Sequence, residues 1–513
     1  MIAIREKAGH SAEATSGLYY QLSGCCQAQQ DPAGAQRALT RLVTSFERAT
    51  SPTDVRLVTP LRQLADFYVA QRQYPEAEAT LQRALTISQQ ASPDAAGDRL
   101  PLLTQLASIY YMSQQYDRAE AVYREGVTLA DTTKPVCNPT QLAAHAQLAS
   151  FYQKRKNYPA ATAVWTPLLT RIRQENGPEA PEQVPVLERL ATLAEVEYAW
   201  ETATAVLMQM LALQGKPGDQ SSVRSQTIGR LVAVHARQQQ FSEAVALLTN
   251  ELTALEQVLG PQDPALLTAL LPLATVTVQA GNLEHAQPLL ARITTILKTA
   301  KRPMAPEVQH IYVMLADAYR AQQKQADAET ILLHALQRAE DLTGPTDPSL
   351  VVLLHRLGGE YLQRQQYTKA QPFFQRSLAL QEAAHGAADQ RLLWPLTQLA
   401  LLLRYQQQFP EALNYLNRAL AITEHEYGVD HPQLISLLLQ ASDVQIGATQ
   451  YAGAETSIQR AVKIGERAYG PHDRKLLPLL QRYANLLTTT GRQDEARAVT
   501  TRFQAIAQPP TPK

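Results

Sequence analysis

The sequence has few cysteines, no long apolar segment and no signal-peptide pattern at its start. Its three cysteines, Cys25, Cys26 and Cys137, lack both the spacing of a metal site and the even number of a disulfide framework. We therefore expect no metal site, and we expect Cys25 and Cys26 to be buried free thiols. No apolar run approaches the roughly eighteen residues of a membrane span. A cytoplasmic protein without membrane insertion is expected, with export left open in case the true start lies upstream.

Charge of either sign is not in excess. Lys and Arg together number 47, as do Asp and Glu, so the formal net charge is zero. Nucleic-acid binders usually carry a basic excess because neutralising phosphates supplies much of their affinity. The balance therefore argues against a nucleic-acid partner, while an apolar content of 45% is normal for a folded chain.

Signatures of catalysis are also missing. The stretch "LQGKPG" around Lys216 lacks the upstream glycine of a phosphate-binding loop, and no GxSxG nucleophile motif occurs. His425 and His431 lie six residues apart across a glycine, which is not the i, i+4 spacing of a zinc pair on a helix. We expect no enzymatic activity, no catalytic residue and no cofactor.

What the sequence does contain is one period that runs through its whole length. Alanine recurs in steps of 42 residues, with a single step of 41, at Ala35, Ala77, Ala119, Ala161, Ala203, Ala244, Ala286, Ala328, Ala370, Ala412, Ala454 and Ala496. Leucine precedes most of these alanines by thirteen residues, and an aromatic residue often precedes them by three. Repetition at 20 to 50 residues is typical of a repeat array.

Within each unit the apolar spacing is helical. Ala77, Leu81, Ala84 and Leu85 follow the i, i+4, i+7, i+8 pattern of one helix face, and a similar run precedes them across a short polar stretch. Stretches such as "GPTDPSLV" at Gly344 supply a helix-ending glycine, an Asp N-cap and a proline at the first helical position. Each unit is therefore predicted to be two helices joined by a tight turn, with the repeated alanine at their closest crossing.

These columns resemble the tetratricopeptide repeat in a long, 42-residue form, as in "LADFY" and "QYPEAEATLQRAL" between Leu64 and Leu85. The stretch "RALAITEHEYGVDHPQL" is similar to repeats of the kinesin light chain and related bacterial proteins. The resemblance implies an all-α solenoid, a superhelix of about twelve repeats. It would run continuously over residues 12–507, between tails at 1–11 and 508–513. Eight residues beyond the usual 34 are about two helical turns, which suggests one more turn on each helix.

The resemblance implies binding of proteins or peptides, without catalysis, on the concave face lined by the first helices. We expect an interaction scaffold or adaptor. The alternative is a peptide-sensing regulator that changes the pitch of its superhelix, because each repeat contacts only its neighbours.

Candidate peptide-binding residues interrupt a mostly small and neutral surface on the first helices. They are Arg320, His355, Trp394, Arg404 and Tyr405. Arginines and aromatic rings together can hold an acidic peptide or a C-terminal carboxylate. The alternative is that they are ordinary solvated or packing residues, partly neutralised by Asp317 and Asp443.

Two further expectations concern irregular parts of the array. Pro272, inside a predicted first helix, predicts a kink or a split helix and a joint near 270–330. In the last helix, 495–507, the residues Val499, Phe503 and Ile506 predict an apolar end that supports self-association.

Overall fold

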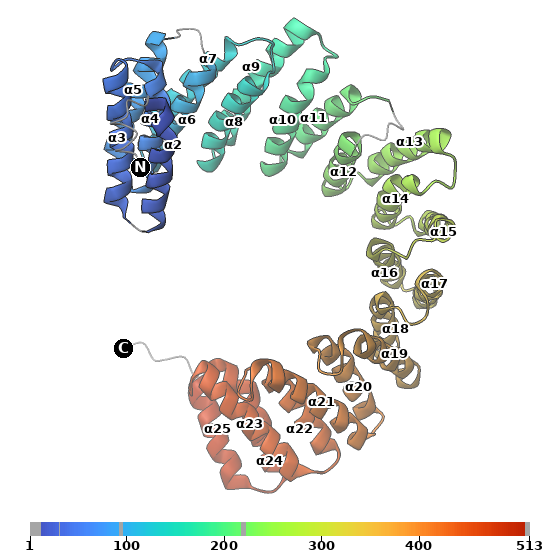
Figure 1. Cartoon of the computed structure of the whole chain (residues 1–513). Helices are drawn as coiled ribbons and strands as arrows, with labels where there is room; N and C mark the ends of the chain where they lie inside the picture. The colour runs from blue at the N-terminus through green and yellow to red at the C-terminus, as the bar shows by residue number, and fades with distance from the viewer. Residues whose placement is uncertain (1–11, 30, 92–95, 217–221, 508–513) are drawn as a thin grey trace. The chain divides into compact units, whose positions relative to one another are not determined.

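Paired helices make up almost all of the computed structural model, which describes residues 12–29, 31–91, 96–216 and 222–507. These residues contain 24 α-helices and six short 3-10 turns but no strand. The helices form twelve consecutive pairs, in which the even-numbered helix comes first and the odd-numbered helix second (Figure 1). The predicted all-α fold of about twelve helix-turn-helix repeats is confirmed.

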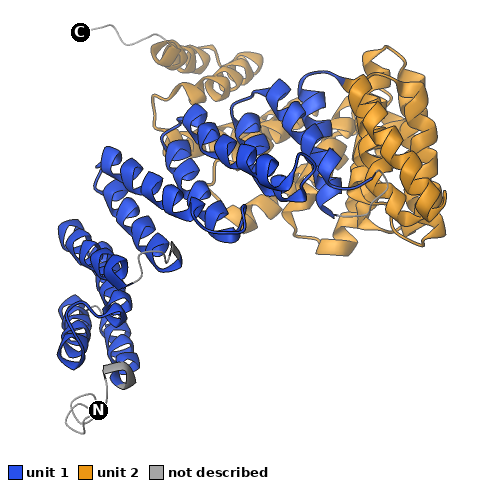
Figure 2. Ribbon diagram, turned by 90° about the horizontal axis from the view of Figure 1, so that it is seen from above, with its two compact units in different colours: residues 1–240 blue, residues 241–513 orange. Residues whose placement is uncertain are grey.

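The chain divides into two compact units, Met1–Gln240 and Phe241–Lys513, which Figure 2 colours separately. The helices of unit 1 are α2 (Ala12–Ala28), α3 (Pro32–Ala49), α4 (Val58–Ala70), α5 (Tyr74–Ala91), α6 (Ala96–Met112), α7 (Tyr116–Asp131), α8 (Pro139–Lys154), α9 (Tyr158–Asn176), α10 (Val184–Val196), α11 (Trp200–Leu213) and α12 (Ser222–Arg237). Its 3-10 turns are η1 (Val55–Leu57) and η2 (Pro181–Gln183).

Unit 2 holds the remaining helices, α13 (Phe241–Leu259), α14 (Leu267–Gln279), α15 (Leu283–Thr299), α16 (Pro306–Ala321), α17 (Gln325–Thr343), α18 (Val351–Gln363), α19 (Tyr367–His385), α20 (Leu393–Tyr405), α21 (Phe409–Tyr427), α22 (Leu434–Gly447), α23 (Tyr451–Tyr469), α24 (Leu477–Thr489) and α25 (Gln493–Ala507). Its 3-10 turns are η3 (Pro264–Leu266), η4 (Pro348–Leu350), η5 (Gln390–Leu392) and η6 (Arg474–Leu476).

Within each unit, a second helix packs on the first helix of its own pair, where that helix belongs to the same unit, and on the first helix of the next pair. In unit 2, α14, α16 and α18 lie on one side and α15, α17 and α19 on the other (Figure 1). We call the even-numbered helices of unit 2, α14 to α24, the first-helix layer, and its odd-numbered helices, α13 to α25, the second-helix layer. Eleven of the twelve repeated alanines are fully buried, and Ala496, in the last pair, is 5% exposed. A methyl group is therefore all that the crossing between paired helices accommodates.

The junction between repeats follows the predicted signals with one addition. Gly344 ends α17 with a φ of 92°, and the side chain of Asp347 accepts a hydrogen bond from the backbone N–H of Ser349. The cap opens a 3-10 turn, η4, before α18 begins. In the related junction after α21, His431 stands where Asp347 does, and its Nδ1 accepts a bond from Gln433 N–H at 3.3 Å.

In each pair from α4–α5 onward, the tight turn contains one residue with positive φ. Glycine occupies this position at Gly281 and Gly491, but most repeats use a longer side chain, such as Gln365 (φ 58°) or Gln407 (φ 61°). The residue that follows Gln365 closes the helix end, because Gln366 N–H donates to the carbonyl of Tyr361 at 2.9 Å. The turn is thus a left-handed C-cap, which normally favours glycine.

Three expectations need correction. Cys25 is exposed and Cys26 and Cys137 are half-buried, although all three are free thiols, because adjacent helical positions cannot share one buried face. The split helix predicted at Pro272 is wrong, since α14 begins only after the 3-10 turn η3 and then runs through the proline, whereas the alternative, a kink, stays a prediction.

The apolar end expected at the last helix is the third correction. Ile506 is buried in the core of the last repeats, and Val499 and Phe503 pack against the same cluster. These side chains therefore cover α23 and α24. Self-association, the continuity of the array across residues 12–507 and a joint near 270–330 stay predictions.

Candidate functional site

The five sequence-predicted residues lie on three first helices of unit 2, Arg320 on α16, His355 on α18, and Trp394, Arg404 and Tyr405 on α20. They do not converge into one cluster. Instead, the contacts define three groups, one around Arg320, one around His355 and Trp394, and one around Arg404 and Tyr405.

Arg320 belongs to a network of charges inside the protein. Its guanidinium donates to Asp317 Oδ1 at 2.6 Å and to Glu360 Oε1 at 2.8 Å. Glu360 is only 5% exposed, and Arg356 and Arg364 each approach it to 4.0 Å. Removing a partner from a buried carboxylate is costly, so a ligand carboxylate would have to compete with Glu360 for Arg320.

The rings of His355 and Trp394 are in contact and tilted by 34° relative to each other. Their ring centroids are 3.9 Å apart, and the imidazole Nε2 lies 2.5 Å from Ser377 Oγ on α19. Burial lowers the pKa of His355 to about 4, so the ring is neutral at pH 7. The indole also meets Phe374 edge-on at 5.5 Å, yet Trp394 remains 41% exposed. This group offers a fixed apolar surface and no positive charge.

Arg404 and Tyr405 form the third group, at the end of α20. The Tyr405 ring stacks on Tyr367 with centroids 5.1 Å apart and planes 9° apart, and it is 50% exposed. Arg404 lies over the same ring at 5.3 Å and bonds Asp443 Oδ2 at 3.2 Å. Asp443 is shared with Arg482 on α24. Both predicted arginines are therefore already neutralised, as the alternative interpretation of the sequence expected.

The first helices that carry the five predicted residues nevertheless also expose apolar side chains. Val352 on α18 is 55% exposed and occupies the same repeat position as Trp394, 42 residues later on α20. Tyr405 follows Trp394 by eleven residues on the same helix, which places it about 16 Å further along. On α18 and α20, these exposed apolar side chains are therefore separate from one another and do not line one pocket.

Sequence reasoning missed a second recurrent feature, in the second-helix layer. An arginine six residues after the repeated alanine reaches the preceding second helix, where it binds a glutamate and a loop carbonyl. Arg460, for example, binds Glu424 at 2.7 Å and donates to the carbonyl of Val429 at 2.8 Å. We call this arrangement the arginine clamp. Its members in unit 2 are Arg292 with Glu256, Arg376 with Glu340, Arg418 with Glu382, Arg460 with Glu424, and Arg502 with Glu466.

The signal for the clamp was present in the sequence as two fixed offsets, arginine at +6 and glutamate at +12 from the alanine. Its function could not be read there, because the two partners belong to different repeats, 36 residues apart. Among the described residues of unit 1, one such clamp is present, Arg83 with Glu47 at 2.6 Å.

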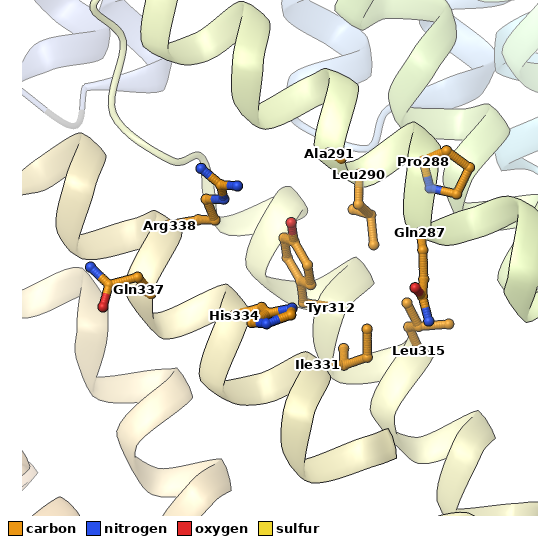
Figure 3. Close-up of a pocket in the computed structure, with 10 residues that line it drawn as sticks. All are labelled: Gln287, Pro288, Leu290, Ala291, Tyr312, Leu315, Ile331, His334, Gln337 and Arg338. Carbon is orange, nitrogen blue, oxygen red and sulfur yellow. The ribbon is translucent and has the colours of Figure 1, made fainter. Parts of the chain in front are cut away.

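A pocket opens in unit 2 between α15 and α17, where the +6 position holds His334 instead of arginine. Its volume is about 560 Å³. Tyr312 and Leu315 of α16 lie at its base, and Arg338 stands at its edge (Figure 3).

Other kinds of site were sought in the same residues. Across the described ranges, no group of three or more His, Cys, Asp or Glu side chains is placed to hold a metal ion. None of the described helices combines the length and the apolar character that crossing a bilayer requires.

Paired helices in register, linked by repeated contacts between neighbours, define a helical repeat protein. The tetratricopeptide repeat model matches residues 14–90, 56–132, 224–299, 307–383 and 391–466, which together exceed half of the chain. The chain therefore belongs to the tetratricopeptide repeat family. Repeats of this family serve in general as protein-interaction scaffolds. No curated protein matches the sequence.

Solved structures similar to this chain include BtubC (BKLC) from P. vanneervenii, with 19% identity and a TM-score of 0.35. The match covers 47% of this chain and 92% of that one. Kinesin light chain TPR-like repeats from Podosopora anserina match with 23% identity and a TM-score of 0.31, over 40% of this chain and 97% of that one.

Proposed function

We propose that the protein is a non-catalytic scaffold that binds an extended peptide segment of a partner protein along the first-helix layer of unit 2. The observation that carries the proposal is the exposure of Val352 and Trp394 at equivalent positions of neighbouring helices. Exposed apolar residues in a repeating frame are spaced to take successive apolar side chains of one peptide.

The two aromatic residues of this surface are held in place before any ligand arrives. Trp394 rests on His355, and Tyr405 rests on Tyr367. Binding then orders few side chains, which keeps its entropic cost low, and Trp and Tyr are the residues that most often dominate binding energy at interfaces. Arg320 and Arg404 would sit at the rim, because their charges are already paired.

The test begins with selection of peptides from a displayed random library against the intact protein. Peptides that bind are then measured against the variants Trp394→Ala, Tyr405→Ala and Val352→Ser. We expect each substitution to weaken binding about tenfold or more, the equivalent of about 1.4 kcal/mol. Arg320→Ala and Arg404→Ala should have smaller effects.

The matched control is Val258→Ser, which removes a 66% exposed valine from α13 in the second-helix layer. If Val258→Ser weakens binding as much as Trp394→Ala does, the first-helix layer is not the site. Small-angle scattering of the same complexes would show whether peptide binding changes the length of the molecule, as the regulatory alternative requires.

A further inference from the structure

The arginine clamp is interrupted at one junction of unit 2. Between α15 and α17, the clamp positions hold Lys298 in place of glutamate and His334 in place of arginine. Two basic residues cannot form the ion pair that joins the other neighbouring second helices of this unit. The loop before α16 also differs, because Ala305 replaces the capping aspartate and no 3-10 turn precedes the helix.

His334, which stands in the arginine position of the interrupted clamp, lines the pocket of Figure 3. Its base is apolar, with Leu290, Leu315 and Tyr312 at most 5% exposed. Its rim is polar, with His334 and Arg338 one helical turn apart on α17. Figure 3 shows the Tyr312 ring standing between these two side chains and Leu290 of α15.

The basic side chains at this rim have no hydrogen-bond or ion-pair partner within the part of the chain that the structure describes. Neither His334 nor Arg338 makes a side-chain hydrogen bond or ion pair there, and both are exposed. Of the two acidic residues that follow Arg338 on α17, Glu340 is held by Arg376 in the next clamp, and Asp341 accepts a hydrogen bond from Gln337. Lys298 adds a further exposed positive charge at the end of α15.

From this geometry we infer a second binding site, in the second-helix layer, for an acidic peptide that combines carboxylates with a large apolar side chain. A peptide carboxylate accepts hydrogen bonds from Arg338 and His334, in the way that Glu424 pairs with Arg460 in an intact clamp. The apolar side chain of the peptide packs on Tyr312 and Leu315. The ligand thereby supplies the acidic half of the missing clamp. This site shares no residue with the surface proposed above, although α16 contributes Tyr312 and Leu315 here and Arg320 there, and the inference is independent of that proposal.

The probe is a fluorescein-labelled peptide in which Glu-Glu-Leu-Phe-Glu-Glu is flanked by Gly-Ser, measured by anisotropy against the full chain. Arg338→Gln and His334→Ala should each weaken binding about tenfold or more. Lys463→Gln, which removes an exposed lysine from α23 in the same layer, should leave binding unchanged. A peptide with every Glu replaced by Gln should bind at least tenfold more weakly.

Four results would overturn the inference. The first is that the unmodified protein does not bind the peptide at concentrations up to about 1 mM. The second and third are that the Gln peptide, or a single-stranded DNA oligomer of the same charge, binds as tightly as the Glu peptide. The fourth is that Arg338→Gln leaves the affinity for the Glu peptide unchanged. A second experiment restores the clamp with Lys298→Glu and His334→Arg together, so that an internal carboxylate competes with the peptide for the basic side chain at position 334. The double variant should lose peptide binding and melt at a higher temperature, while His334→Arg alone keeps a basic rim and should still bind. Peptide binding by the double variant at unchanged affinity would also overturn the inference.

Discussion

The ring of Phe374 on α19 lies against the α-carbon of Gly358 on α18, and a β-carbon at 358 would come within 2.5 Å of its Cε1. Most repeats have alanine at the position of Gly358 and leucine or isoleucine at that of Phe374. The smaller and larger residues compensate each other across one helix crossing.

We expect Gly358→Ala to lower the free energy of unfolding by about 1 to 3 kcal/mol, because the added methyl group overpacks this contact. Phe374→Leu in the same chain should recover part of that loss. The unmodified protein, the two single variants and the double variant form a double-mutant cycle. Urea unfolding of these four proteins should show that the effects of the two substitutions on the free energy of unfolding are not additive. The control is Gly359→Ala, whose β-carbon meets nothing within 4 Å. It should stabilise the helix, since alanine is the better helix former by about 1 kcal/mol. Equal effects of the two alanine substitutions would contradict the packing argument.

Ala412 tests the same crossing at a position where the repeat has alanine throughout. It is fully buried in α21. Ala412→Leu should destabilise the protein by about 1 to 3 kcal/mol in thermal or urea unfolding. Ala452→Leu, on an exposed position of α23, is the matched control and should change stability by less than about 0.5 kcal/mol. An unchanged melting temperature for Ala412→Leu would mean that the crossing has spare room.

The left-handed turn within each pair offers a stabilising substitution. Gln407 has a φ of 61°, and glycine occupies the same position at Gly281 and Gly491. Since a side chain disfavours this conformation, Gln407→Gly should raise the free energy of unfolding by about 0.5 to 1 kcal/mol. Gln481→Gly, within α24, should lower it by a similar amount. If both substitutions lower the melting temperature, backbone strain at this turn is not the controlling factor.

The residues that recur every 42 positions predicted the fold because each of them makes a contact within its own repeat, and the same contact occurs in repeat after repeat. The buried alanines and the junction signals around Gly344 needed nothing beyond local spacing. The site was harder to predict. The sequence suggested Asp317 and Asp443 as neutralising partners of Arg320 and Arg404, but it did not reveal the buried partner Glu360, which lies 40 residues from Arg320 in the next repeat. Contacts between repeats have no local pattern, and so the clamp and its interruption at His334 appear only in the folded chain.

His355 should make stability depend on pH. Its pKa is about 4 in the folded protein and near 6.5 in an unfolded chain. Between these values the unfolded chain binds more protons than the folded one, so stability present above pH 6.5 is lost as the pH falls toward 4. We expect His355→Gln to show a shallower fall in melting temperature over this window than the unmodified protein. Other titrating groups, including His145, are common to both proteins and cancel in the difference between the two curves. Parallel curves would show that the imidazole is charged in the fold.

The arginine clamp should stabilise the junction between repeats by an amount that salt reduces. Arg460 binds Glu424 and the carbonyl of Val429, and both side chains of the ion pair are about one third exposed. Arg460→Met keeps the apolar stem and removes the charge, so it should cost about 1 kcal/mol in urea unfolding at low ionic strength. The difference should shrink at 1 M NaCl, where the Debye length is about 3 Å. Lys463→Met, three residues further along α23 and without a recorded partner in the described residues, controls for loss of one positive charge. A loss for Arg460→Met that salt leaves unchanged would assign the stabilisation to the carbonyl bond and the packing of the stem.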